Sequence, residues 1–131
     1  MVTAADNLLE VENLGIRYGN RVVLEGVTLQ VRRHEIFGII GPANAGKTSF
    51  LRSLNRMDEF LPNTRVDGSI RFAGRDVREI QNLYALRRRI GVVFPLPVGL
   101  PLSIYDNVAL APRLRGVRSK SELDEIGRAH V

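Results

Sequence analysis

Gly41-Pro42-Ala43-Asn44-Ala45-Gly46-Lys47-Thr48 decides the fold, because it fits the pattern G-x-x-x-x-G-K-[ST] and separates two segments of different periodicity. Before it, residues 36–40 form a short apolar run without alternation, which predicts a strand covered on both faces. After it, apolar residues recur at helical spacing from Phe50 to Met57. The stretch therefore predicts a strand-to-helix turn that binds the phosphates of a nucleotide.

The residue types in this turn suit a triphosphate, whose dense negative charge is best held by backbone N–H groups and a helix N-terminus. Lys47 adds a mobile positive charge for the outer phosphates, and the Thr48 hydroxyl can ligate the accompanying Mg²⁺. Gly46 lets the backbone approach a phosphate closely, and we extend the predicted site to Ser49. Positions 43–45 lack glycine, and Asn44 is the residue there that best tolerates a left-handed conformation. The alternative is a glycine-capped turn that binds nothing.

Composition narrows the class of protein. The chain has 131 residues, 44% of them hydrophobic and 25% charged, which suits one globular domain and not two. No apolar run approaches the length of a membrane span, and the first residues lack the order of a signal peptide, so we expect a cytoplasmic protein. The absence of cysteine excludes disulfides and thiolate metal sites. His34 lies in a polar turn, where we expect it to be solvated.

The net charge of +5 is concentrated in three clusters, at residues 32–33, 87–89 and 113–120. Only Tyr84 and Phe94 lie near these clusters, and they do not form the interleaved stacking pattern of nucleic-acid binders. We therefore predict no nucleic-acid partner. A face toward a membrane protein or anionic lipid is the preferred interpretation of the charge.

Alternation of apolar and polar residues predicts an antiparallel group of strands around the turn. Half-exposed strands are expected at residues 8–18, 21–24, 27–31 and 68–72, the last ending in an Ala73-Gly74 turn. A short helix is expected at residues 83–88. Residues 90–94 form a second apolar run of the buried-strand type.

Residues 95–101 contain three prolines, which predict a stiff, extended loop with a functional role. Ser103 is expected to cap a helix that runs from Ile104 toward Leu110 and is limited by Pro112. Either Ser119 or Ser121 is expected to open another helix.

This order of strands, phosphate loop, helix and second loop resembles the nucleotide-binding subunit of ATP-binding cassette (ABC) transporters, over residues 8–125. The resemblance implies an α/β fold of the P-loop NTPase type. It would contain N-terminal antiparallel strands, part of the parallel-sheet core and the start of the helical subdomain. Residues 1–125 would then be the N-terminal half of the domain. In Arg17-Tyr18-Gly19, Tyr18 matches the family's aromatic residue that stacks on adenine; the alternative is a half-buried strand aromatic.

Four segments look like those of phosphate-import ATPases within the family: residues 54–57, 66–68, 86–94 and 103–108. The phosphate assignment is associational, because substrate choice belongs to the partners. The resemblance implies ATP and Mg²⁺ as cofactors. It also implies transmembrane permease subunits and a second ATPase subunit as partners, with a periplasmic binding protein acting indirectly. The protein would lie at the cytoplasmic face of the membrane.

One departure from the family pattern is Pro95, which stands where the family has a glutamine that offers a carboxamide toward Mg²⁺ and the attacking water. Proline has neither a backbone donor nor a side-chain acceptor. We expect ATP hydrolysis with a weaker loop contact, or with that contact moved to another residue. The alternative is a neutral variation.

The family's signature, its Asp-Glu strand and its switch histidine are absent from these 131 residues. We therefore expect no hydrolysis by this chain alone, and a poorly stable, aggregation-prone fragment. Residues 126–131, Ile-Gly-Arg-Ala-His-Val, can be back-translated into the start of a common sequencing adapter. We expect them to be a non-native tail, in which His130 has no function.

Three alternatives to this interpretation stay open. One is a different P-loop protein such as a kinase or GTPase, although it would lack antiparallel strands with an aromatic ahead of the loop. Another is an ABC ATPase for another substrate. The third is a nucleotide module that binds without hydrolysis.

Overall fold

The computed structural model describes residues 6–96 and 98–128. It divides into two compact units, Met1–Val92 and Val93–Val131.

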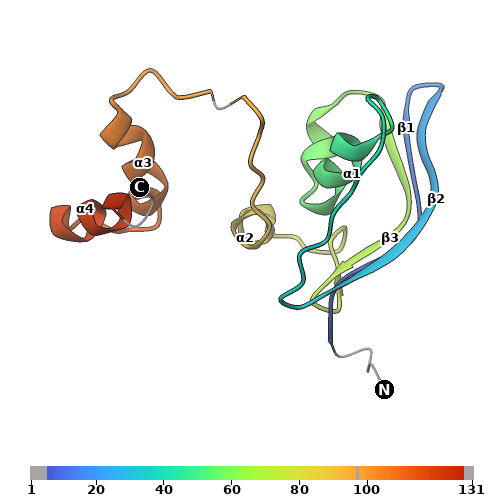
Figure 1. Cartoon of the computed structure of the whole chain (residues 1–131), viewed down its shortest axis with the longest axis horizontal. Helices are drawn as coiled ribbons and strands as arrows, with labels where there is room; N and C mark the ends of the chain where they lie inside the picture. Colours follow the sequence, from blue (N-terminus) through green and yellow to red (C-terminus); the bar gives the residue numbers. More distant parts are fainter. Residues whose placement is uncertain (1–5, 97, 129–131) are drawn as a thin grey trace. The chain divides into compact units, whose positions relative to one another are not determined.

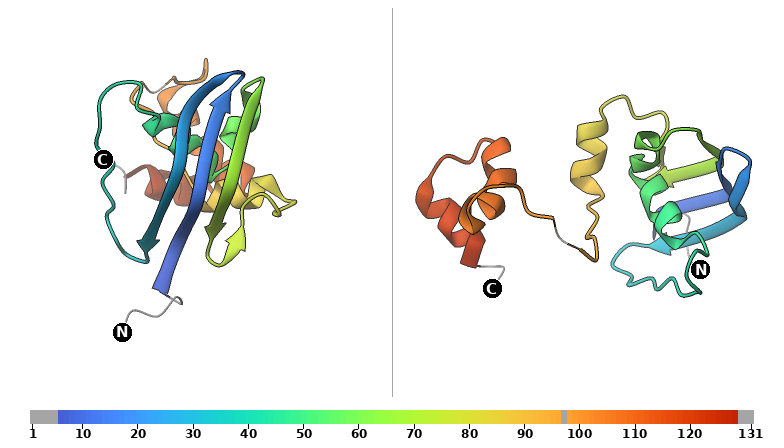
Figure 2. Two further views of the ribbon diagram at one scale, coloured as in Figure 1. Left: turned by 90° about the vertical axis from the view of Figure 1, so that its right-hand side faces the viewer. Right: turned by 90° about the horizontal axis from the view of Figure 1, so that it is seen from above.

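The first unit is built on a four-stranded antiparallel sheet with the strand order β2-β1-β3-β4. Its strands are β1 (Asn7–Tyr18), β2 (Arg21–Arg32), β3 (Thr64–Phe72) and β4 (Arg75–Asp76). Figure 2 shows β1 between β2 and β3. The predicted antiparallel strands are therefore confirmed, although residues 21–32 form one strand instead of two.

Two features of the backbone set the register of this sheet. Ala73 and Gly74 both have positive φ, 50° and 77°, which is what a two-residue hairpin turn requires between Phe72 and its partner Arg75. Gly68 has a φ of 85°, and a Cβ there would lie 2.4 Å from the carbonyl oxygen of Asn13. Glycine at position 68 thus lets β3 approach the irregular stretch of β1 between Glu12 and Gly15.

The core lies on one face of the sheet, where α1 (Lys47–Leu54) and α2 (Leu83–Arg89) supply Phe50 and Leu86. Alternate residues of the strands meet them, because successive strand side chains point to opposite faces. The sheet and its following turn contribute Leu9, Val11, Leu14, Ile16, Ile70, Phe72 and Val77. A short 3-10 helix, η2 (Met57–Phe60), follows α1, and Figure 1 shows α1 beside the sheet. The predicted helix at residues 83–88 is confirmed.

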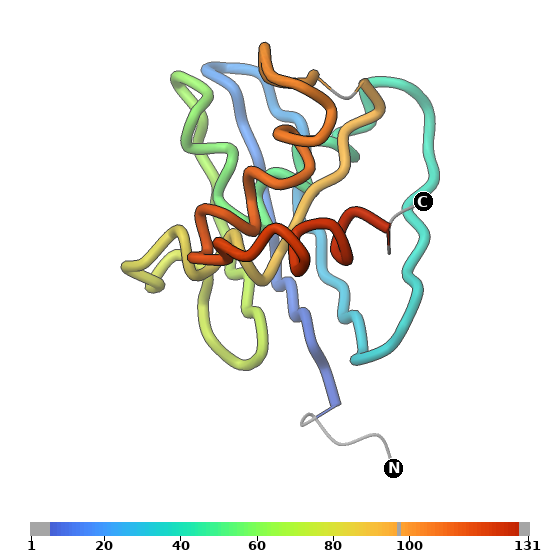
Figure 3. The backbone as a smooth tube through the Cα atoms, turned by 90° about the vertical axis from the view of Figure 1, so that its left-hand side faces the viewer, coloured from blue at the N-terminus to red at the C-terminus, as the bar shows by residue number. Residues whose placement is uncertain are grey.

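The two segments predicted as buried parallel strands are not strands in this structure, and that prediction was wrong. Residues 36–40 and 91–94 have no regular secondary structure, and the side chains of Ile36, Ile40 and Val93 are almost fully exposed. Figure 3 shows residues 33–46 as a long loop that leaves β2 and returns to α1. The physical reason is that a parallel strand is held only by a partner from a distant segment, and no described residue pairs with either run. The parallel part of the predicted α/β fold is therefore not formed among the described residues.

The second unit contains α3 (Ile104–Leu114) and α4 (Lys120–Arg128). The Ser103 cap is confirmed, since its Oγ accepts a hydrogen bond from the backbone N–H of Asp106 at 3.0 Å. The prediction that Pro112 limits this helix was wrong. The helix continues to Leu114 because the N–H of Arg115 closes the last turn on the carbonyls of Ala111 and Pro112.

Ser119 directly precedes α4, so the first of the two predicted helix starts is confirmed. Residues 126–128 of the predicted non-native tail continue α4, while residues 129–131, with His130, lie outside the described residues. Within residues 6–96 and 98–128, no helix is both long and apolar enough to cross a membrane.

Candidate nucleotide site

The phosphate loop enters α1 through two residues with left-handed backbone. Asn44 has a φ of 63° and Gly46 a φ of 88°, so Asn44 adopts the left-handed conformation that the sequence indicated it could tolerate. The backbone N–H of Phe50 donates to the carbonyl of Gly46 at 2.9 Å. Helix geometry leaves the preceding N–H groups, those of Lys47 to Ser49, without partners inside the helix. These groups are the donors that an anion at a helix N-terminus uses.

Gly46 is fixed by the packing of the loop against β2. A Cβ at this position would lie 2.7 Å from Leu24 Cδ2 and 3.0 Å from the carbonyl oxygen of Val23. Such distances are shorter than van der Waals contact, so a larger residue would push the loop away from the sheet. The glycine therefore sets how closely the loop approaches the strand.

A cavity of about 210 Å³ lies between this loop and the ends of β1 and β2. It is lined by Tyr18, Arg21, Val23, Asn44, Ala45, Gly46, Lys47, Thr48 and Ser49. The structure thus brings Tyr18 together with the later part of the phosphate loop, while Gly41, Pro42 and Ala43 do not line the cavity.

Arg21 and Val23 line this cavity and were missed by sequence reasoning. Arg21 is the cross-strand partner of Tyr18 across the Gly19-Asn20 turn, and Val23 follows two residues later in β2. The turn signal after Tyr18 is the feature that could have found them, because a two-residue turn places position 21 opposite position 18.

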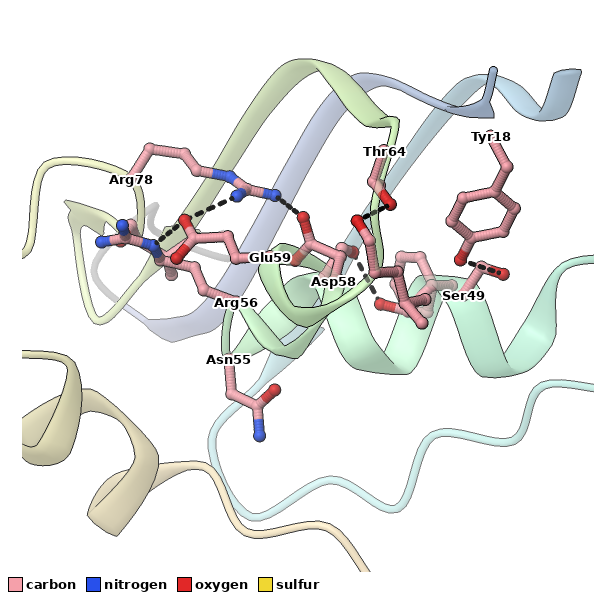
Figure 4. Close-up of polar contacts among 12 residues, drawn as sticks. Tyr18, Ser49, Asn55, Arg56, Asp58, Glu59, Thr64 and Arg78 are labelled. Atoms are coloured by element: carbon pink, nitrogen blue, oxygen red, sulfur yellow. Dashed lines mark hydrogen bonds and ion pairs between the residues drawn. The ribbon is translucent and has the colours of Figure 1, made fainter. Parts of the chain in front are cut away.

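The Tyr18 side chain is half-buried, and its hydroxyl donates a hydrogen bond to Ser49 Oγ at 2.9 Å (Figure 4). Ser49 belongs to the first turn of α1. This bond joins the end of β1 to the start of the helix that follows the phosphate loop.

The Lys47 ammonium folds back onto its own loop. Its Nζ donates to the carbonyl oxygens of Gly41 at 2.7 Å and Pro42 at 2.5 Å. Phosphate oxygens are stronger acceptors for an ammonium than neutral carbonyls, because the negative charge of the phosphate adds ion-pair attraction to the hydrogen bond. The Lys47 side chain is therefore held at the loop by the carbonyl oxygens of Gly41 and Pro42. A bound phosphate would replace these weaker acceptors.

The loop fits Mg²⁺ only as a partner of phosphate. Thr48 lines the cavity and its side chain is exposed, so its hydroxyl is available as a ligand. Among the residues that the structure describes, no cluster of His, Cys, Asp or Glu could hold a metal by itself. Mg²⁺ in such sites commonly combines one or two protein oxygens with substrate phosphates and water.

Pro95 is exposed in the second unit, and its predicted role stays a prediction.

A network of polar side chains holds the residues that follow α1, including η2, in place (Figure 4). Asp58 is buried and accepts from Arg78 at 2.8 Å. Burial raises the pKa of Glu59, but the hydrogen bond from Arg56 and the arginine charges around it outweigh burial and hold the pKa below its usual value. Arg87 donates to the backbone carbonyls of Asn55 and Arg56. These bonds satisfy carbonyls just beyond the end of α1, and they hold η2 and α2 to it.

The comparisons with known proteins all point to ABC transporters. The family model described as "ABC transporter" matches residues 24–130. A "Phosphate import ATP-binding protein PstB" from Thermotoga maritima is 45% identical over 120 residues, which is 91% of this chain and 48% of that protein. "Phosphate import ATP-binding protein PstB 2" from Bacillus licheniformis is 41% identical over 124 residues, 94% of this chain and 45% of that protein. The chain thus spans a little under half the length of these relatives.

Among solved structures, a bacterial Atm1-family ABC exporter with ATP bound matches with a TM-score of 0.75 and 25% identity. The match covers 95% of this chain and 20% of that one. Together with the loop geometry, the match of the family model over most of the sequence shows that this chain belongs to the ABC transporter family, as part of its ATP-binding domain.

Proposed function

We propose that this chain is the ATP-binding part of an ABC importer subunit that couples ATP binding and hydrolysis to transport, with inorganic phosphate as the cargo. The observation that carries the proposal is the cavity that unites Tyr18 with Lys47 and Thr48. It combines an aromatic ring with a loop of anion-binding donors, which is the chemistry that a base joined to phosphates needs. Phosphate as the cargo is supported by the two relatives named as phosphate import proteins.

Each residue of the site has a proposed role. The Tyr18 ring would stack on adenine, and the Lys47 ammonium would neutralise the outer phosphates. The backbone of residues 41–49 would hold the phosphate oxygens, as helix N-termini do. The Thr48 hydroxyl would hold Mg²⁺, which neutralises phosphate charge when bound.

The proposed role as an importer's ATP-binding subunit implies protein partners for this chain. We propose transmembrane permease subunits, a second ATPase subunit in a head-to-tail dimer and, indirectly, a periplasmic binding protein, with the protein at the cytoplasmic face of the membrane. Residues 1–125 would form the N-terminal half of the nucleotide-binding domain. Residues 126–131 would be a non-native tail, an idea that other codons in the nucleotide record would contradict.

The test of nucleotide binding is a Lys47→Ala variant. Loss of a charge-assisted contact to phosphate should weaken binding of a fluorescent ATP analogue with Mg²⁺ about 10- to 100-fold, measured by equilibrium titration. Lys120→Ala is the matched control, because Lys120 is an exposed lysine at the start of α4 and should bind as the unaltered chain does. Equal affinity of the Lys47→Ala and Lys120→Ala variants would overturn the proposal.

A second candidate is a nucleotide module that binds without hydrolysis, and the observation that favours it is Pro95. We expect a Pro95→Gln variant of the complete protein to raise ATP turnover and to alter its Mg²⁺ dependence, since glutamine restores a side-chain carboxamide. Unchanged turnover with unchanged Mg²⁺ dependence would show that the residue is a neutral variation. Nucleotide binding with no turnover in either form would favour the second candidate.

A further inference from the structure

Two serines in α1 use their hydroxyls differently. Ser53 is fully buried, and its Oγ donates to the carbonyl of Phe50 at 2.7 Å, which is the common local bond of a helical serine. Ser49 instead accepts from the Tyr18 hydroxyl, at a distance of 31 residues along the chain. The hydroxyl of Ser49 is therefore oriented by another element of the fold, strand β1. Ser49 also lines the cavity.

The direction of this bond has a chemical consequence. A serine hydroxyl has one proton to donate and two lone pairs that accept. Because Tyr18 donates to Ser49 Oγ, it occupies a lone pair and leaves the serine proton available for another acceptor. In a chain of hydroxyls, each hydrogen bond strengthens the next. The Tyr18 hydroxyl thus makes Ser49 a better oriented and stronger donor.

We propose that Tyr18 has a second role beyond its ring: its hydroxyl positions Ser49 so that the serine proton is donated to a phosphate oxygen of the nucleotide. This inference rests on the proposed function and deepens it. Tyr18 is then a positioning residue that links the base end of the nucleotide to its phosphate end. The ring and the hydroxyl serve different parts of one ligand.

The test is Tyr18→Phe in the full chain, because phenylalanine keeps the ring and removes only the hydroxyl. ATP should bind about 2- to 10-fold more weakly, the effect of one net hydrogen bond. Adenosine, which has no phosphate, should bind equally well to both forms. Tyr84→Phe is the matched control, since Tyr84 is an exposed tyrosine of α2 and should leave ATP affinity unchanged.

A double-mutant cycle separates positioning from an independent effect. In a Ser49→Ala background, Tyr18→Phe should cause no further loss of ATP affinity, because its hydroxyl no longer has a serine to position. Ser49→Thr keeps a hydroxyl and should restore affinity to within about 2-fold of the unaltered chain. Circular dichroism of each variant checks that the fold is retained.

The outcomes distinguish this inference from the proposed function. An unchanged ATP affinity in Tyr18→Phe, an equal loss for adenosine, or the same loss in the Ser49→Ala background would overturn the positioning role. If Tyr18→Ala weakens ATP binding while Tyr18→Phe does not, the stacking role stands and only the positioning role falls. If neither Tyr18→Ala nor Lys47→Ala weakens binding, the proposed function itself falls.

Discussion

Strand β1 and the segment at residues 36–40 are both rich in apolar residues, yet the first is the centre of the core and the second is exposed. In β1, Leu14 and Ile16 are fully buried, whereas Ile36 and Ile40 of the other segment are almost fully exposed. The difference is in pairing. β1 has neighbours on both edges, one of them joined by a two-residue turn, while residues 36–40 have none in the described part of the chain. Hydrophobicity marks a residue that gains from burial, but pairing decides whether the burial occurs.

The largest expected difference between β1 and residues 36–40 is in the cost of removing side-chain volume from each. Leu14→Ala should destabilise the sheet by about 2–5 kcal/mol, because it leaves a cavity in a fully buried site. Hydrogen–deuterium exchange of the β1 and β3 amides in the 131-residue chain measures the loss as lower protection.

Ile40→Ala is the matched control, since it removes a similar volume from an exposed side chain. It should change protection in the same strands by no more than about 0.5 kcal/mol. A cost for Ile40→Ala equal to that of Leu14→Ala would mean that residues 36–40 are paired and buried in solution.

The comparison also explains what the sequence could predict. The Gly19-Asn20 turn, the Ser103 cap and the left-handed Asn44 depend on neighbours within a few residues, so local patterns were sufficient for them. The strands were predicted from their own alternation of apolar and polar residues, although the pairing of β1 with β3 joins distant segments. The state of residues 36–40 depends on distant partners, and a local pattern predicts only that such a segment would be buried if it were paired. The bond between Tyr18 and Ser49 is of the same kind, because it joins residues that only the folded sheet and α1 bring together.

The Ser103 cap of α3 is held by contacts between near neighbours in the sequence, and the effect expected from disturbing it is the smallest. Ser103 Oγ donates to the Asp106 carboxylate at 2.6 Å, and Arg113 pairs with the same carboxylate at 2.7 Å. The hydrogen bond from Ser103, with the contribution of Arg113, holds the pKa of Asp106 below its usual value. A carboxyl whose pKa is lowered by folding stabilises the fold above its unfolded pKa of about 3.9, and that contribution is lost as the pH falls through its lower folded value.

We therefore expect the amide signals of residues 103–107 to report fraying of the helix start as the pH is lowered below about 4, in an NMR titration. In an Asp106→Asn variant, this pH dependence should disappear, because the amide cannot titrate. If the unaltered chain and the variant fray over the same pH range, the start of α3 is held by something other than these local bonds. In that case even the cap, the most local feature of the fold, would depend on longer-range contacts, as the segment at residues 36–40 does.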